Sequence, residues 1–223
     1  MKLRKMIEMF RAFRAGAPLG DVAVLKLDAF SGPSKEISNK LEALRGYAPD
    51  QSLPVLRELR AGTLGREYVR FLDLNMLEPL AISPAMKERF RASPYVLRYT
   101  TTHDLHHVLT GFDTGLAGEA GVIGFNVGQG SAPIGRAMLW VVRIVYSILS
   151  PTQAREIWHN VRVGLRLGEE AELVIAEPIE SFFEEPLARI REKLGIPDPA
   201  EAGVLPSRRS VLGDILYSRK KAP

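Results

Sequence analysis

Three Ser-Pro pairs recur along this chain and constrain its fold more than any other feature. Ser83-Pro84, Ser93-Pro94 and Ser150-Pro151 each place a residue that caps helix N-termini directly before a proline. Proline is favoured at the first helical position because it has no N–H to satisfy there. Gln153 follows Ser150 at the spacing of a capping box. The repeated pattern predicts that helices begin at these points.

Glycines mark the opposite ends of several segments. Gly16, Gly46 and Gly195 each follow a run with helical spacing, and a glycine in the left-handed conformation commonly ends a helix. No stretch alternates apolar and polar residues as a half-buried strand does. We therefore expect an all-α protein, a single-domain irregular multi-helix bundle over residues 1–223. The expected helices cover residues 3–15, 21–30, 35–45, 53–60, 64–77, 84–110 (with a possible break at the second Ser-Pro pair), 116–128, 134–149, 151–173, 178–194 and 208–218.

The chain has no cysteine, which excludes disulfides, thiolate zinc sites, iron–sulfur clusters and cysteine nucleophiles. Histidine and carboxylate side chains are then the ligands available for a metal. The sequence contains no run of about eighteen or more uncharged apolar residues, and its first six residues mix charged and apolar side chains. A membrane-spanning helix and a secretion signal are therefore not expected, and we expect a cytoplasmic protein.

Positive charge is concentrated at the two ends of the chain. Residues 1–14 carry five cations against Glu8, and the basic C-terminal segment 207–223 carries five against Asp214, although the net charge is only +4. A nucleic-acid-binding protein usually carries its basic patch on the folded body, among aromatic residues. Basic ends instead favour an anionic membrane surface, with residues 1–15 as an interfacial helix. Packing of that helix onto the body is the alternative.

Three of the four histidines fall within five residues, from His103 to His107. On a helix, His103 and His107 lie one turn apart, close enough for both imidazoles to bind one cation. Asp104 lies about 100° around the helix, where it can supply a third ligand or orient a ligating imidazole. Glu119 follows a glycine-containing turn that can return it to the histidine face. His106 points elsewhere and is not an expected ligand.

Ordinary surface or hydrogen-bonded histidines are the alternative explanation of a His-x-x-x-His pair. The hypothesis is a site of two histidines and one or two carboxylates, with no thiolate. Because fewer than four protein ligands are assigned with certainty, such a site keeps a coordination position open for water or substrate.

The sequence His103-Asp104-x-x-His107, followed by eleven residues and Glu119, resembles the signature of the coenzyme Q biosynthesis protein 4 family. The resemblance extends over roughly residues 50 to 196. It includes Gly62–Tyr68 with Phe71-Leu72, Arg98-Tyr99, Thr102, His107–Phe112 and Leu187–Ile196. His106 departs from the family pattern, which has a bulky aromatic or apolar residue at this place.

This resemblance implies an all-helical protein that is required for making ubiquinone. It implies one divalent metal at His103, Asp104, His107 and Glu119, with zinc expected first and magnesium or iron as alternatives. It also implies a polyprenyl quinone precursor as ligand, peripheral attachment to the inner face of a membrane, contacts with other quinone-biosynthesis enzymes, and a homodimer. Similar proteins are credited with oxidative decarboxylation at ring carbon one of polyprenylated hydroxybenzoate. Asp104 and Glu119 would then be catalytic, tuning the metal and moving a proton.

Small residues repeat after Glu119 on roughly one side of the expected helix. They allow either an isoprenoid chain or a neighbouring helix to approach closely. The apolar segment 137–149 is too short and too charged to span a bilayer, so it is either a core helix or the wall of a lipid tunnel. The candidate lipid contacts are Gly121, Gly124, Gly128, Met138 and Val142.

Two other functions fit the same residues. A non-catalytic lipid-binding scaffold would hold a structural metal, and metal removal would then unfold the protein. A two-metal carboxylate bundle would combine Asp104-x-x-His107 with Glu156-x-x-His159, and Glu119 would bridge the metals.

Overall fold

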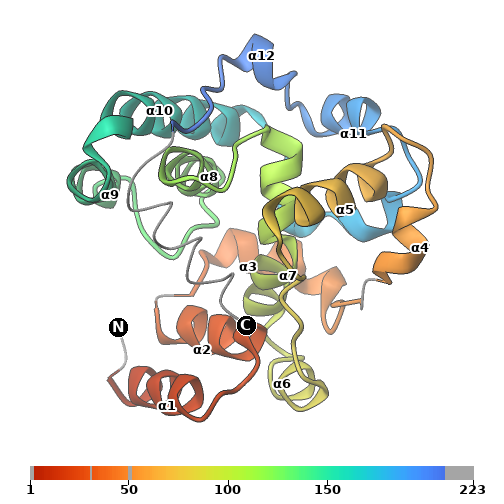
Figure 1. Ribbon diagram of the computed structural model, residues 1–223. Coiled ribbons are helices and arrows are strands. Elements are labelled where there is room, and N and C mark those ends of the chain that lie inside the picture. Colours follow the sequence, from red (N-terminus) through yellow and green to blue (C-terminus); the bar gives the residue numbers. More distant parts are fainter. Residues whose placement is uncertain (1–2, 31, 50–51, 209–223) are drawn as a thin grey trace. The chain divides into compact units, whose positions relative to one another are not determined.

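The computed structural model describes residues 3–30, 32–49 and 52–208, and these ranges are all-α, as predicted (Figure 1). Within them the extended pairing is one isolated antiparallel bridge between Thr63 and Pro186. The α-helices are α1 (Leu3–Arg14), α2 (Leu19–Ala29), α3 (Lys35–Leu41), α4 (Leu53–Arg57), α5 (Leu64–Asn75), α6 (Pro84–Arg89), α7 (Pro94–Thr110), α8 (Leu116–Gly128), α9 (Met138–Leu149), α10 (Ala154–Glu170), α11 (Leu187–Leu194) and α12 (Pro199–Ala202). The short 3-10 helices are η1 (Glu42–Leu44), η2 (Pro151–Gln153), η3 (Val174–Ala176) and η4 (Ile179–Phe182).

Two of the Ser-Pro pairs begin α-helices as predicted. The Ser83 hydroxyl accepts a hydrogen bond from the Met86 N–H at the start of α6. Helix α7 begins at Pro94, so the chain breaks at the second pair and residues 84–110 form two helices. The three glycines expected at helix ends, Gly16, Gly46 and Gly195, have φ values of 73°, 75° and 68°.

The capping box expected at Ser150 is wrong. The Ser150 side chain makes no capping hydrogen bond, and η2 stands between it and α10. The Gln153 side chain accepts a hydrogen bond from the Ala117 N–H instead. Its amide is therefore used to join this turn to α8 and does not serve as a capping partner.

The expected helix over 178–194 is two short elements. Pro186 stands between η4 and α11, and a proline both lacks the N–H and crowds the preceding turn. Helix α12 was not expected, although the Asp198 side chain caps it in the ordinary way by accepting from the Ala200 N–H. The expected helix over 208–218 and the basic segment over 207–223 lie outside the described residues from 209 onward.

The contacts of the chain form two compact units, and the first comprises residues 1–105 and 173–190. The guanidinium of Arg98 is fully buried inside it, 2.6 Å from a carboxylate oxygen of Glu180. It also donates to the carbonyl oxygens of Ile175 and Glu177, so its charge is compensated. The apolar core around α2, α3 and the start of α7 includes Val24, Leu25, Ile37, Leu41, Val96 and Leu97.

The second unit comprises residues 106–172 and 191–223, and α8 packs against α10 within it at very short range. A Cβ added at Gly124 would lie 2.6 Å from the Val161 carbonyl oxygen, and one added at Gly128 would lie 2.3 Å from that of Leu165. The apolar core between α8, α9 and α10 includes Ala117, Ala120, Val127, Leu139, Ile157 and Val161.

These contacts correct the expected lipid contacts at three glycines. Beside Gly124 and Gly128 the neighbouring backbone of α10 leaves no room for an isoprenoid chain. At Gly121 the Phe112 ring fills the space, 2.5 Å from an added Cβ. The glycines serve close helix packing, which was the alternative. Lipid contact at Met138 and Val142 stays a prediction.

Helix α1 presents two apolar faces. Met9 and Ala12 pack against the core of the first unit, so the helix docks on the body. Its opposite side exposes Leu3 by 73% and Phe10 by 54%, and Phe13, one turn after Met9, is 60% exposed. Among the described residues no helix is both long and apolar enough to cross a membrane.

Candidate metal centre

Two consecutive helices and the turn between them carry the candidate ligands. Helix α7 ends at Thr110, and Gly111 follows with a φ of 77°, a left-handed conformation that reverses the chain. Helix α8 begins at Leu116 and holds Glu119 in its first turn, where the helix dipole favours a carboxylate.

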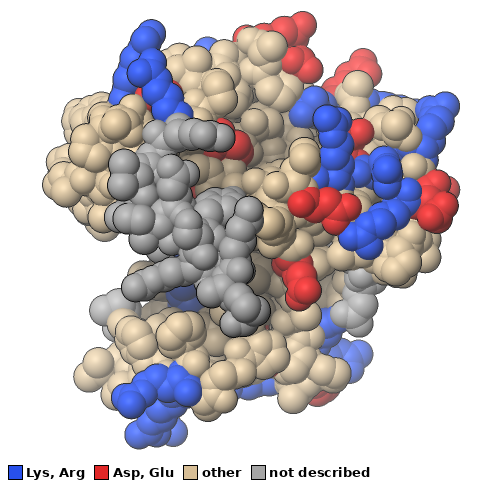
Figure 2. Space-filling model, in the orientation of Figure 1, with Lys and Arg blue, Asp and Glu red and all other residues tan. Residues whose placement is uncertain are grey.

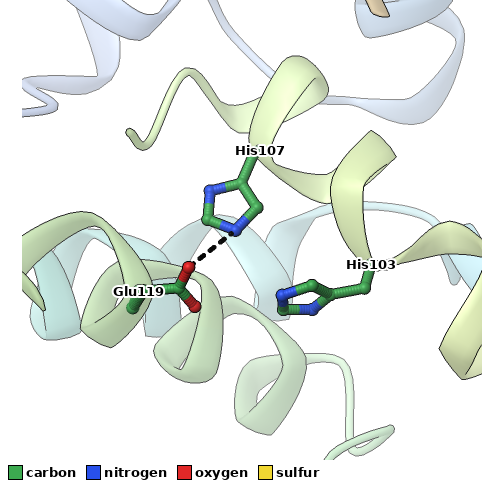
Figure 3. Close-up of side chains that lie close together, drawn as sticks. All are labelled: His103, His107 and Glu119. Carbon is green, nitrogen blue, oxygen red and sulfur yellow. Dashed lines mark ion pairs between the residues drawn. The ribbon is translucent and has the colours of Figure 1, made fainter. Parts of the chain in front are cut away.

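The structure brings His103, His107 and Glu119 together (Figure 3). One ligand atom from each residue lies within 4.8 Å of the others. Both imidazoles point from the same side of α7 toward Glu119, and Nε2 of His107 lies 3.5 Å from Oε1 of Glu119. The side chain of His107 is 1% exposed and that of Glu119 is 33% exposed, so solvent reaches the group at Glu119.

A backbone carbonyl fixes the tautomer of His107. Its Nδ1 lies 3.0 Å from the carbonyl oxygen of Phe112. Because a carbonyl can only accept, Nδ1 carries the hydrogen, and in the neutral ring Nε2 presents its lone pair to Glu119. Burial lowers the pKa of His107, which favours this neutral ring.

This arrangement fits a bound cation. A neutral Nε2 and a carboxylate oxygen at 3.5 Å are two acceptors that face each other, and a cation between them would remove the repulsion. Two ligands on one tetrahedral zinc ion, each at about 2.1 Å, are separated by roughly 3.4 Å. Two histidines and one carboxylate suit zinc, and the same set binds ferrous iron in oxygenases.

Asp104 is not part of this group. The residue is half-buried on α7, and burial raises the pKa of its carboxyl to about 6. Burial also raises the pKa of the Tyr68 hydroxyl on α5, and the charge of Asp104 raises it further. Asp104 thus faces the Tyr68 side of α7, and its roles as ligand and catalytic residue stay predictions.

The other two histidines lie outside the group. His106 is fully buried, with its ring centre 5.6 Å from that of Phe125. Nε2 of His159 lies 2.8 Å from the Gly203 carbonyl oxygen, and Glu156 pairs with Arg208 at 2.8 Å. Across the described ranges, His103, His107 and Glu119 are the one such ligand group. The two-metal alternative therefore has no second group there.

Sequence reasoning missed two residues beside the site. Burial raises the pKa of Tyr146 on α9, and the charge of Glu119 raises it further, so this hydroxyl lies near the Glu119 carboxylate. Arg191 donates to the carbonyl oxygens of Leu109 and Val108 and so caps the end of α7 just after His107. Neither residue belongs to a local motif, since both reach the site from distant segments.

The chain matches the family model described as coenzyme Q (ubiquinone) biosynthesis protein Coq4 over residues 48–200. The Mus musculus protein named ubiquinone biosynthesis protein COQ4 homolog, mitochondrial, is 33% identical over 150 residues, which are 66% of this chain and 55% of that protein. The protein of the same name from Danio rerio is 34% identical over 189 residues, 82% of this chain and 68% of the relative. The match thus spans about half the length of the mouse relative.

A solved structure shows the same fold. A crystal structure of a Nostoc punctiforme protein superposes with a TM-score of 0.58 at 23% sequence identity, and covers 88% of this chain and 97% of the other. At this identity the similarity concerns the fold alone.

Proposed function

Because the chain belongs to the coenzyme Q biosynthesis protein Coq4 family, we propose that it acts in ubiquinone biosynthesis as a metal-dependent protein that binds a polyprenylated quinone precursor. The observation that carries the proposal is the orientation of His107, whose Nδ1 is held by Phe112 and whose Nε2 faces Glu119. A histidine held in this way by a backbone carbonyl is typical of metal ligands.

His103, His107 and Glu119 would hold one divalent ion, with zinc expected first and iron or magnesium as alternatives. The bound ion would supply a Lewis acid for the carboxylate or adjacent hydroxyl of the precursor ring. Glu119, whose side chain is 33% exposed, would move a proton between the site and solvent.

The reaction we propose is oxidative decarboxylation at ring carbon one. It replaces the carboxyl group by a hydroxyl whose oxygen comes from water. Carbon dioxide leaves, and two electrons and two protons pass to an external two-electron oxidant. Asp104, near Tyr68 and with a raised pKa, would be the second proton-transfer group.

The proposal also includes peripheral attachment to the inner face of a membrane and contacts with other quinone-biosynthesis enzymes. That the protein forms a homodimer stays an expectation. The exposed apolar side of α1 supports attachment, since Leu3 and Phe10 lie there beside the cations Arg4 and Arg11.

The test combines metal analysis with complementation of a quinone-deficient strain. We expect about one divalent ion per chain, lost in His103→Ala and His107→Ala, because either change breaks the chelate. Glu119→Gln should keep the fold and lower quinone production by at least tenfold. His106→Phe, which changes a buried histidine outside the group, is the control and should keep both metal and activity.

Two results would count against this function. Full metal occupancy in the His103→Ala, His107→Ala double variant would refute the ligand assignment. Normal quinone production from Glu119→Gln and from folded, metal-free His103→Ala protein would favour the non-catalytic scaffold.

A further inference from the structure

Helix α9 exposes one apolar half to solvent. Its seven exposed large side chains are Met138 (45%), Trp140 (57%), Val141 (46%), Ile144 (50%), Val145 (43%), Ile148 (72%) and Leu149 (46%). At about 100° per residue they cover roughly half of the helix circumference without one polar side chain between them. The other half, around Leu139 and Val142, packs on the core of the second unit. The polar side chains of the helix, Arg143, Tyr146 and Ser147, lie outside the exposed half.

The segment that contains this face carries charge of one sign, although Glu169 of α10 pairs with its Arg136. Residues 120–155 contain no aspartate or glutamate and three arginines. Arg143 lies at the edge of the apolar half, 5.5 Å from the ring centre of Trp140 and 5.2 Å from that of Trp158 on α10. Burial lowers the pKa of the Arg143 guanidinium, and the charge of Arg162 lowers it further. In Figure 2 the surface over α9, at the left edge, is free of charged side chains.

We propose that the exposed half of α9 inserts into the interface of an anionic lipid bilayer. Half of a helix about 10–12 Å across corresponds to the depth of about 5–10 Å at which interfacial helices lie. Tryptophan and arginine at the edge of the apolar half would then lie at the headgroups, where such side chains are favoured. This deepens the membrane attachment in the proposed function, but it depends on neither the metal nor the reaction.

A second copy of the chain fits this face less well. Twelve residues form a helix about 18 Å long and about 10 Å wide. Its footprint is on the order of 200 Å², against about 800 Å² per partner in a stable interface. Helix α9 itself carries Arg143 and no acidic residue, so a second α9 packed on this face would offer that cation no carboxylate.

The experiment uses the full chain and vesicles of phosphatidylglycerol and phosphatidylcholine in equal parts. The chain has two tryptophans, and Trp140 and Trp158 lie in contact at this surface, so quenching by brominated acyl chains reports directly on its insertion. Ile144→Asp with Ile148→Asp is the test variant. Val55→Asp with Leu74→Asp is the matched control, since those side chains are 61% and 72% exposed on α4 and α5.

We expect quenching of the wild type, at least a tenfold lower partition coefficient for the α9 variant, and less than a twofold change for the control. Vesicles of phosphatidylcholine alone should bind the wild type several-fold more weakly. Equal binding by the α9 variant and the wild type would overturn the inference. So would unquenched wild-type protein that self-associates at micromolar concentration and is dispersed by the α9 changes, which would assign the face to a second copy.

A further pair of variants separates this result from the proposed function. Ile7→Asp with Phe10→Asp alters only the exposed side of α1, and the tryptophan quenching should persist in it. The Glu119→Gln protein should also bind vesicles as the wild type does. Loss of quinone production with intact vesicle binding would then concern the metal centre and not α9.

Discussion

Asp104 is a carboxyl group near the candidate metal centre, and its burial makes the stability of the folded protein depend on pH. Its pKa is raised to about 6 because burial penalises the charged form. The unfolded chain has an ordinary, lower carboxyl pKa, so the folded state binds the proton more tightly. Stability is therefore present at low pH and is lost as pH rises from about 4 through about 6.

Asp104→Asn should remove this loss in metal-free protein. We expect the variant to be about 1–2 kcal/mol more stable than the wild type at pH 7.5, with little difference at pH 4, since asparagine has no charge to bury. Urea unfolding at the two pH values measures the effect. A constant difference between variant and wild type across this range would show that Asp104 titrates normally.

The candidate site could be predicted only in part from the sequence. The spacing of His103 and His107 places both on one face of any helix, and the glycine turn explains the return of Glu119. The structure separates Asp104 from that group because its rotation of about 100° turns it toward Tyr68. No local pattern predicts Tyr146, which comes from α9.

At the scale of elements, the contact of α8 with α10 is the closest helix packing near the site. A Cβ added at Gly164 would lie 2.0 Å from the Gly121 carbonyl oxygen, and one added at Gly168 would lie 2.1 Å from that of Phe125. These neighbours are backbone atoms and cannot rotate away. Helix α8 also carries Glu119, so a shift in this packing would move a candidate ligand.

Gly164→Ala should therefore destabilise the protein by at least about 1 kcal/mol, because the overpacking outweighs the better helix propensity of alanine. Gly135→Ala is the control, since nothing lies within 4 Å of its added Cβ, and its effect should stay within about 0.5 kcal/mol. Denaturant unfolding compares the two. Equal midpoints for both variants would mean that α8 and α10 separate without cost.

The class of the fold was predictable because the helix signals are local. Ser83 caps α6 with its own side chain, and proline at a first helical position needs no distant partner. The capping box predicted at Ser150 does not form, because a distant contact decides the role of Gln153. Its side chain accepts from the N–H of Ala117, a residue 36 positions away in sequence. The break at Pro186 was visible in the sequence and should have ended the expected helix there.

At the scale of the whole molecule, two helices belong to both compact units. The division falls inside α7 after Leu105 and inside α11 after Ile190. Separate unfolding of one unit would have to break the continuous hydrogen-bond ladder of both helices. We therefore expect helix propagation to couple the units, because ending a helix internally leaves unsatisfied backbone groups. The single-domain organisation of residues 1–223 stays a prediction.

We expect one cooperative unfolding transition, which a substitution in the first unit and a probe in the second can test. Arg98→Met leaves the buried Glu180 carboxylate without its cation and should cost about 3–5 kcal/mol. Both tryptophans lie in the second unit, so their fluorescence follows that unit alone, whereas circular dichroism follows helix throughout. If the chain is a single domain, the tryptophan and dichroism transitions of the Arg98→Met variant both move to lower denaturant concentration by the same amount. If the tryptophan transition stays in place while the dichroism becomes biphasic, the two units unfold independently.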